Sequence, residues 1–472
     1  MKRPHLFSTI LAGAALTGCS AFGSTDTDPP PLQTAWLRGD LDAATDAVPK
    51  ETTTPIPKLE QGMVGLAEAS LDRASVTFRD ASQSLEEEVY TDKTVAEVAG
   101  VLVQSVTAGL TEEPYVPPPY QLAVAESVTA LSYAARAADR DAALDQARNF
   151  ASDASGRSIA AWVQATAGVA DLGEEFEVSH AHTALPHFLH ASLIEHEDRA
   201  AADKLYARAA EIEPRPGIDA QRERCAPATG TQPVWIYVLE GPRAYRVEEN
   251  DAVAGAAKTI VTALIAAAQQ IDGGNVAPDV VQTVLSSRFP VPARAPIEPS
   301  IAGVDVLVDD AETANEMPLI ADLDATAKAS FEVERDVRVA RQAVRAALRR
   351  AGTTAAGASG DEMLGAAAKY GSAAVELTER ADLRDWATMP GRVRALRVDL
   401  APGRHRLTLA VRGAPSDVRI GSARITARDA AAANATIDVD VPSSNTPVFV
   451  LAVVPSAASI GRIATNAPAL VE

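Results

Sequence analysis

The sequence predicts an α+β fold, in which a helical N-terminal half is followed by a mixed α/β region with a long helix and by a small C-terminal β-sandwich. Alanine-rich amphipathic stretches fill the chain from Thr34 to about Pro214, which is typical of helices that pack closely through small side chains. Strand-like runs begin only after Pro214, and the segment after residue 390 alternates with the period of a β-strand. Since one domain holds roughly 150 residues, the 472 residues predict several domains.

The composition is that of a folded protein, with 47% hydrophobic and 22% charged residues. These values exclude a disordered chain and a polytopic membrane protein. The 63 acidic residues outnumber the 43 basic residues and leave a formal charge of -20. Because nucleic-acid binding needs clustered positive charge, we expect no nucleic-acid partner.

The N-terminus predicts export and a lipid anchor. Residues 1–18 have the pattern of a signal peptide, because a cationic start precedes an apolar stretch too short to cross a hydrocarbon core of ~30 Å. The ending Leu16-Thr17-Gly18-Cys19 resembles the lipobox of bacterial lipoproteins. That resemblance implies that Cys19 carries diacylglycerol and palmitate, which anchor the chain to a membrane. The alternative is an ordinary secretory signal followed by a chance cysteine. If Cys19 carries the lipid, residues 19–31 form a tether between the membrane and the folded part of the chain.

A helical domain is predicted over residues 32–214, where three helical hairpins share one pattern. In the third hairpin, the order Ala202, Tyr206, Ala209, Pro214 resembles the second helix of a tetratricopeptide repeat. The resemblance implies hairpins stacked into a curved solenoid, since no such hairpin buries its apolar face alone. The alternative is a helical bundle without repeats. The hairpins cover 32–48, 122–150 and 184–214, and they turn at Gly39-Asp40, Ala138-Asp139 and Glu197-Asp198.

The mixed α/β region is predicted over residues 230–390. Val234–Leu239 is rich in β-branched and aromatic residues and predicts a strand, with Ala244–Val247 as its partner across a tight turn. Val304–Val308 predicts a short buried strand. Leu319–Arg350 predicts the longest helix, because its apolar residues recur every three or four positions.

Residues 391–460 are predicted to form the small β-sandwich domain. The expected turn between the first two strands is Ala401-Pro402-Gly403. Two packed sheets are the natural way to bury four or five short strands. The expected strands are 393–400, 406–411, 437–441 and 448–454.

Three segments resemble, in the same order along the chain, a family of uncharacterised bacterial envelope lipoproteins. They are Glu113-Pro114-Tyr115 ahead of Tyr120, the hairpin with Ala138-Asp139, and Ala381–Pro390, where Leu383 and Asp385 depart from the family pattern. The resemblance implies a tetratricopeptide-like N-terminal half and a C-terminal α/β part. It implies a cell-wall context and no established activity.

The sequence lacks the common catalytic motifs. It contains no Ser-x-x-Lys, no Gly-x-Ser-x-Gly, no His-Glu-x-x-His and no phosphate-binding Gly-x-x-x-x-Gly-Lys-Ser/Thr. Five histidines between His180 and His196 are the one metal-binding candidate, since His187 and His190 share a helix face and His182 could fold back toward them. The alternative is that these histidines pack within a repeat, and we expect no cofactor.

Six further residues are candidates for binding a partner. Two tyrosines flank a proline-rich segment, whose alternative role is a rigid crossover between hairpins. Three arginines form a stripe on the long helix, whose alternative role is a solvated helix face. A tryptophan at a helix–strand junction either fills the gap between two layers or contacts a partner. These residues are Tyr115, Tyr120, Arg338, Arg341, Arg345 and Trp386.

The sequence therefore predicts a non-catalytic lipoprotein of the bacterial cell envelope, in which a helical-repeat scaffold binds another envelope protein. Ser20 follows Cys19 where an aspartate would favour the inner membrane, so we expect the periplasmic face of the outer membrane. The competing hypothesis is a metal-binding or hydrolytic envelope enzyme that uses the His180–His196 cluster.

Overall fold

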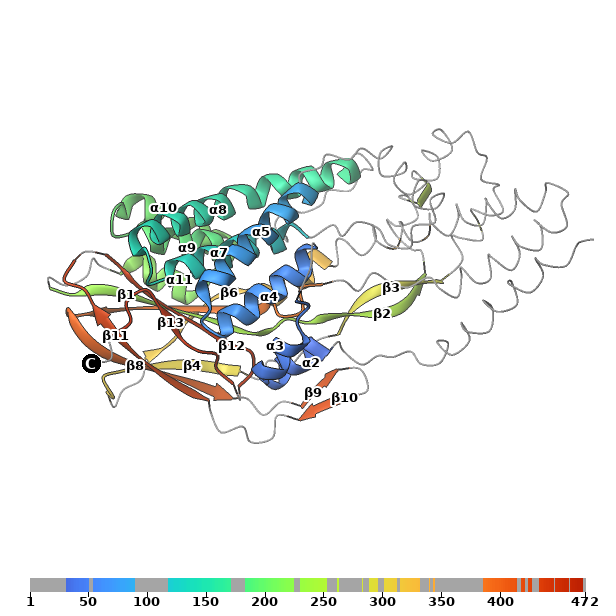
Figure 1. The fold of residues 1–472 in the computed structure, drawn as a ribbon. Helices are drawn as coiled ribbons and strands as arrows, with labels where there is room; N and C mark the ends of the chain where they lie inside the picture. Colours follow the sequence, from blue (N-terminus) through green and yellow to red (C-terminus); the bar gives the residue numbers. More distant parts are fainter. Residues whose placement is uncertain are drawn as a thin grey trace, which may run out of the picture.

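In the computed structural model of the chain, helices α2 to α11 precede residue 224 and strands β1 to β13 follow it, which confirms the mixed helix-and-sheet class (Figure 1). The structure describes residues 31–50, 54–89, 118–170, 183–224, 230–252, 261–262, 282, 288–295, 301–311, 315–331, 339, 343, 385–413, 417–420, 423–426, 433–444, 446–457 and 459–469. No helix in this part of the chain is long and apolar enough to cross a lipid bilayer.

The N-terminal half consists of helices that turn where the sequence predicts. Asp40 and Asp198 each accept a hydrogen bond from the backbone N–H three residues later, at 3.0 and 2.9 Å, and so begin the second helices of two hairpins. Gly39 adopts a φ of +69° at the first turn, a left-handed conformation that glycine tolerates. The helices are α2 (Pro31–Arg38), α3 (Leu41–Ala47), α4 (Pro55–Ala67), α5 (Leu71–Val89), α7 (Pro119–Ala134), α8 (Arg140–Ala170), α9 (Leu185–Ile194), α10 (Arg199–Ile212) and α11 (Pro216–Glu223).

Two larger sheets hold most of the strands. One sheet has the order β13-β12-β1-β7-β6, and the other has the order β11-β8-β4-β5. The pairs β2–β3 and β9–β10 form separate two-stranded sheets. The strands are β1 (Gln232–Pro242), β2 (Tyr245–Ala252), β3 (Arg288–Ala295), β4 (Ile301–Val308), β5 (Asn315–Glu316), β6 (Leu319–Asp322), β7 (Pro390–Leu400), β8 (Gly403–Gly413), β9 (Asp417–Ile420), β10 (Ala423–Thr426), β11 (Asn434–Val441), β12 (Val448–Val454) and β13 (Ala464–Thr465).

The predicted strand at 234–239 is confirmed as β1, but its predicted partner is wrong. Residues 245–252 pair with β3, whereas β1 pairs in parallel with β12 and antiparallel with β7. The reason is burial. β1 is apolar on both faces and takes a central position, so that β7 and β12 occupy both of its edges.

Strands from the predicted mixed region and from the predicted C-terminal domain share both larger sheets. β1 pairs with β7 and β12, and β4 pairs with β8. All four expected strands after residue 390 are present, as β7, β8, β11 and β12. The turn at 401–402 carries the chain from one sheet to the other, because β7 and β8 belong to different sheets. It therefore does not close the hairpin that the sequence suggests.

The beginning of the predicted helix 319–350 is wrong. Residues Leu319–Asp322 are strand β6, which pairs with β7, and helical conformation begins at Leu323. Asp322 causes this change, because its carboxylate accepts a hydrogen bond from the N–H of Ala325 at 3.0 Å and starts the helix there. Val339 and Ala343 of the predicted helix are buried. Most of the residues after Phe331, up to residue 384, lie outside the described ranges.

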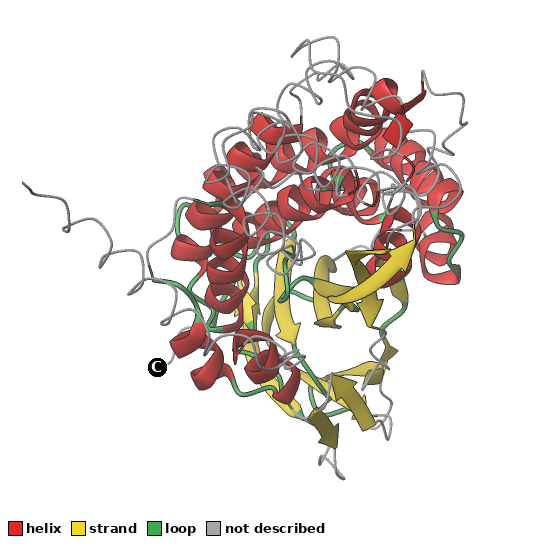
Figure 2. Ribbon diagram, turned by 90° about the vertical axis from the view of Figure 1, so that its right-hand side faces the viewer, coloured by secondary structure: helices red, strands yellow, loops and turns green. Residues whose placement is uncertain are grey.

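The helices and the two sheets form three layers. Successive β1 side chains alternate: Trp235 and Tyr237 pack with the helices, whereas Val234 and Ile236 pack with the four-stranded sheet. Strand β12 alternates in the same way, with Phe449 on the helix side. Seen from the side, the helices lie in an arc around the strands (Figure 2). The five-stranded sheet is therefore covered on both faces.

Candidate functional site

The structure places four of the predicted site residues. Tyr120 on α7 is 2% exposed, and Trp386 is fully buried in the core between the helices and the five-stranded sheet. The tryptophan ring lies 6.2 Å from the ring of Phe78 on α5, so it fills the gap between the layers. His187 and His190 lie on α9. The other predicted residues, Cys19, Tyr115, His182, Arg338, Arg341 and Arg345, lie outside the described residues.

The histidines on and after α9 do not form a metal site with their described neighbours. His190 Nδ1 lies 3.3 Å from the hydroxyl of Ser155, and His196 Nε2 lies 3.3 Å from both Glu197 Oε1 and Arg148 Nη2. Burial lowers the pKa of both His190 and His196. Among the described residues, no three His, Cys, Asp or Glu side chains gather as ligands.

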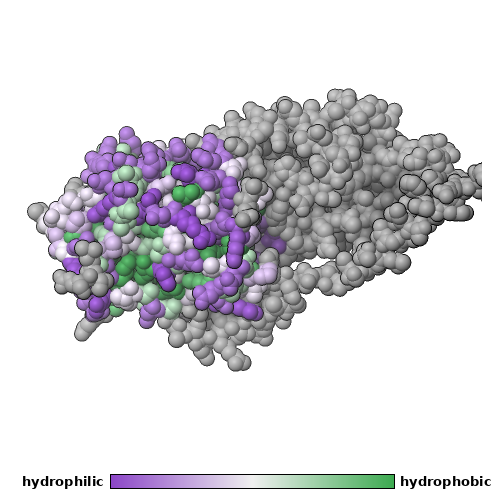
Figure 3. Space-filling view, viewed as in Figure 1, coloured by the Kyte–Doolittle hydropathy of each residue, from purple (hydrophilic) through white to green (hydrophobic). Residues whose placement is uncertain are grey.

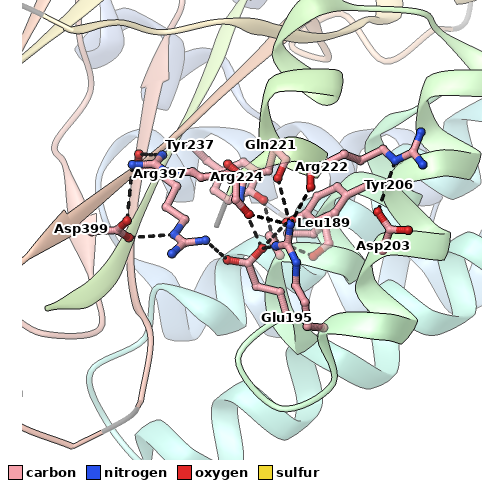
Figure 4. A network of polar contacts seen from close by, with 12 residues as sticks. Leu189, Glu195, Asp203, Tyr206, Gln221, Arg222, Arg224, Tyr237, Arg397 and Asp399 are labelled. Atoms are coloured by element: carbon pink, nitrogen blue, oxygen red, sulfur yellow. Dashed lines mark hydrogen bonds and ion pairs between the residues drawn. The ribbon is translucent and has the colours of Figure 1, made fainter. Parts of the chain in front are cut away.

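A buried cluster of charges centred on Glu195 joins the helices to the five-stranded sheet (Figure 4). Glu195 follows α9, and its Oε1 accepts a hydrogen bond from Arg397 Nη1 of β7 at 2.9 Å. Both side chains are almost completely buried, at 4% and 1% exposure. Oε2 of Glu195 accepts from Arg199 Nη1 at 3.0 Å and from the Tyr206 hydroxyl at 2.9 Å. One carboxylate thus holds groups from α10 and β7.

Further contacts extend this Glu195 cluster along the same interface. Arg397 Nε donates to Asp399 at 2.8 Å, and Arg199 Nη2 donates to main-chain carbonyls around the end of α11. The hydroxyls of Ser192 and Tyr237 lie 2.6 Å apart between α9 and β1. Burial raises the pKa of Tyr206 and of Tyr237, so both phenols remain protonated. The cluster is arranged to fasten two layers together.

A second buried cluster surrounds Asp385, at the entrance to β7. Its carboxylate contacts Arg243, accepts a hydrogen bond from Gln121 Nε2 at 2.9 Å, and lies 3.7 Å from Arg246. Arg243 lies over the ring of Tyr120, 5.9 Å from its centre. Asp385 and both arginines are at most 8% exposed at their side chains. Tyr120 therefore supports this Asp385 cluster instead of facing solvent.

Glu60 of α4 is bound to the same turn. Its carboxylate accepts hydrogen bonds from the N–H groups of Ala387 and Thr388, at 2.6 and 3.1 Å, and contacts the Thr388 hydroxyl. The indole N–H of Trp386 donates to that hydroxyl oxygen at 3.2 Å. The turn 385–389 is thus held by α4 on one side and by the Asp385 cluster on the other.

One histidine–aspartate pair lies at the surface. His405 Nδ1 is 2.7 Å from Asp309 Oδ2, the geometry in which an aspartate orients a catalytic histidine. However, His405 Nε2 lies 2.8 Å from the backbone carbonyl of Ala401, so neither ring nitrogen is available to a substrate. Hydrogen bonds from the N–H of Arg406 and from His405 lower the pKa of Asp309. The pair joins the turn after β4 to strand β8.

The described clusters are therefore structural in their chemistry, since each carboxylate in them binds donors from other elements of the same chain. Comparison with protein-family models, with curated proteins and with solved structures gives no match to this chain. The assignment of function consequently depends on the geometry and the sequence alone.

Sequence reasoning missed Glu60, Glu195 and Arg397, the central residues of these clusters. For two of these residues, the sequence pattern around them indicated a buried polar contact. Glu60 stands between Leu59 and Met63 on the apolar face of its helix, and Arg397 follows Val393 and Ala395 on the inward face of β7. A charged residue on an apolar face indicates a buried polar contact, although it does not identify the partner.

Replacement of Glu195 by alanine should destabilise the protein by about 3–5 kcal/mol, because it removes the carboxylate that Arg397, Arg199 and Tyr206 share. Buried Arg397 then keeps only its contact with Asp399 among the described carboxylates. The matched control is Glu211→Ala on α10, since Glu211 forms an ion pair with Arg208 at 2.8 Å in which both side chains are well exposed. That change should cost at most about 1 kcal/mol. Urea denaturation measures both values. Equal costs for the two variants would contradict the role assigned to the Glu195 cluster.

Proposed function

We propose that this protein is a lipid-anchored, non-catalytic scaffold of the bacterial cell envelope, whose helical layer binds another envelope protein. The single observation that carries the proposal is the Glu195 cluster. Its buried charges hold the helices and the sheet together, so the helices form one layer against the sheet, which can present its other side to a partner. The lipobox at Cys19 supports the anchor, and Ser20 supports the outer membrane.

The proposal includes a tetratricopeptide-like arrangement of the helices. Successive helices from α7 to α10 pack on one another as antiparallel hairpins, and Ala202, Tyr206 and Ala209 are fully buried as in the repeat pattern. A repeat solenoid usually binds its ligand on the concave side. In this chain the helices pack against the five-stranded sheet on one side, through contacts such as Phe188 with Trp235 at 5.9 Å. The partner is therefore assigned to the outer side.

The outer side of the helical layer favours a basic partner. Hydrophilic residues predominate over this layer in the view of Figure 3. Asp141 and Asp145 lie one turn apart on α8, and Arg148 joins Asp145 to Glu197 with two contacts of 2.8 Å. Asp145 and Glu197 are 69% and 55% exposed. Val76, at 44%, is the one large apolar side chain that the described residues expose. A polar, positively charged partner surface fits these features.

Reversal of charge on α8 should remove partner binding. In cells, the double variant Asp141→Lys, Asp145→Lys should lose the partner that crosslinks to the wild-type protein, because two repulsive contacts replace two attractive ones. The matched control is Asp42→Lys, Asp46→Lys, which changes an equally spaced pair of exposed aspartates on α3. The control should keep the partner. Recovery of no partner with wild-type protein, or equal recovery with both double variants, would refute this proposal.

Replacement of Cys19 by serine should release the protein from the membrane fraction, because the variant lacks the thiol to which the lipid is attached. Fractionation of cells measures the change, and outer membranes are the expected location of the wild-type protein. The control is Cys225→Ser, which removes the other cysteine and should leave the protein membrane-bound. A Cys19→Ser protein that fractionates like the wild type would show that Cys19 is not the anchor.

A further inference from the structure

Glu60 is a buried carboxyl group beside which the described part of the chain places no positive charge. It lies on α4 next to Leu59 and close to Met63, which are both fully buried, and it is itself 4% exposed. Its hydrogen bonds come from the N–H groups of Ala387 and Thr388 and from the Thr388 hydroxyl. Among the side chains that the structure describes, no lysine or arginine forms an ion pair with it. The described partners of Glu60 are therefore all neutral donors.

The turn that Glu60 contacts connects directly to a central strand of the five-stranded sheet. The turn 385–389 closes with a hydrogen bond of 3.2 Å from the N–H of Met389 to the carbonyl of Trp386. It leads directly into β7, the strand that carries Arg397 and lies beside the central β1. A change at Glu60 is thus transmitted to the strand that fastens the helical layer to the sheet.

Few of the charged side chains that the structure describes lie around Glu60. Asp385 is the charged side chain that acts on it, and Asp385 is itself paired with Arg243 and Arg246. Burial raises the pKa of Glu60 to about 7, and the charge of Asp385 acts in the same direction. The hydrogen bonds from Thr388 and Ala387 lower the pKa but do not offset the burial.

We propose that Glu60 is a proton-operated latch, which fastens helix α4 to the turn entering β7 and releases that turn when the carboxyl group ionises. In the protonated group the carbonyl oxygen still accepts from an N–H, and the new hydroxyl donates to the Thr388 oxygen in place of accepting from it. The ionised group is a buried charge without a cation, and opening of the turn allows water to solvate it. The device rests on the proposed function, because it controls how firmly the partner-binding layer is held.

The direction of the pH effect follows from proton binding. When the turn is open, Glu60 meets water and has its ordinary pKa of 4.5, whereas the closed form has a pKa of about 7. The closed form therefore binds more protons, so its stabilisation is complete at acidic pH and is lost as the pH rises through about 7. With these two pKa values, the opening equilibrium increases about ten-fold between about pH 6 and pH 8.

Hydrogen–deuterium exchange of the full-length protein in detergent tests the latch at the amides of residues 386–389. After correction for intrinsic rates, exchange in the wild type should increase about ten-fold from about pH 6 to pH 8. Glu60→Gln keeps the shape and an acceptor oxygen but does not titrate, so its exchange should not change with pH. Glu68→Gln removes a carboxylate from the C-terminal end of the same helix and should behave like the wild type.

Equal pH dependence in the wild type and in Glu60→Gln would overturn the proposal, as would an absence of pH dependence in the wild type. If Glu60→Gln does not fold, Thr388→Val provides the second test. Loss of the hydroxyl removes a contact that favours the ionised form, so the increase in exchange should move to higher pH, and an unmoved increase refutes the latch. No partner is present in this experiment, and its failure is thus distinguishable from failure of the proposed function.

Discussion

The burial of β1 on both faces is the constraint on which the rest of the structure depends. One set of its side chains, led by Trp235 and Tyr237, requires an apolar cover from the helices, and the other set, led by Val234 and Ile236, requires a second sheet. Each large side chain that is fully buried contributes about 1.5–3 kcal/mol. The helices before β1 cover one face of this strand, and the sheet formed by later strands covers the other. Both hydrophobic clusters therefore include side chains of β1.

Buried charges determine how the layers meet. Arg397 of β7 binds Glu195 beside α9, and Asp385 before β7 binds Arg243 after β1. Such pairs add little net stability over well-packed apolar groups, but the loss of one partner is costly. They therefore disfavour alternative placements of the helices on the sheet. Because the inner side of the helical layer makes these contacts, our proposal assigns the partner to its outer side.

Local features of this fold were predictable from the sequence, whereas long-range pairings were not. Aspartate caps at Asp40 and Asp198 and the apolar run of β1 are signals within a few residues, and the corresponding turns and strand are present. The contact between Glu195 and Arg397 spans 202 residues, and that between Glu60 and Thr388 spans 328. No pattern within one segment encodes such a pairing. Misplacement of residues 319–322 has a similar cause, since only pairing with β7 makes them a strand.

The central claim is that the helical layer depends on the sheet for its structure. The most direct test is a fragment of residues 31–224, which contains helices α2 to α11 without β1, studied by near-ultraviolet circular dichroism during heating. The account predicts a helical fragment with weak tertiary signals and no cooperative transition, because its inner apolar face lacks the cover that Trp235, Tyr237 and Phe449 provide. A sharp cooperative transition with strong tertiary signals would contradict the account, since it would show an independently folded solenoid.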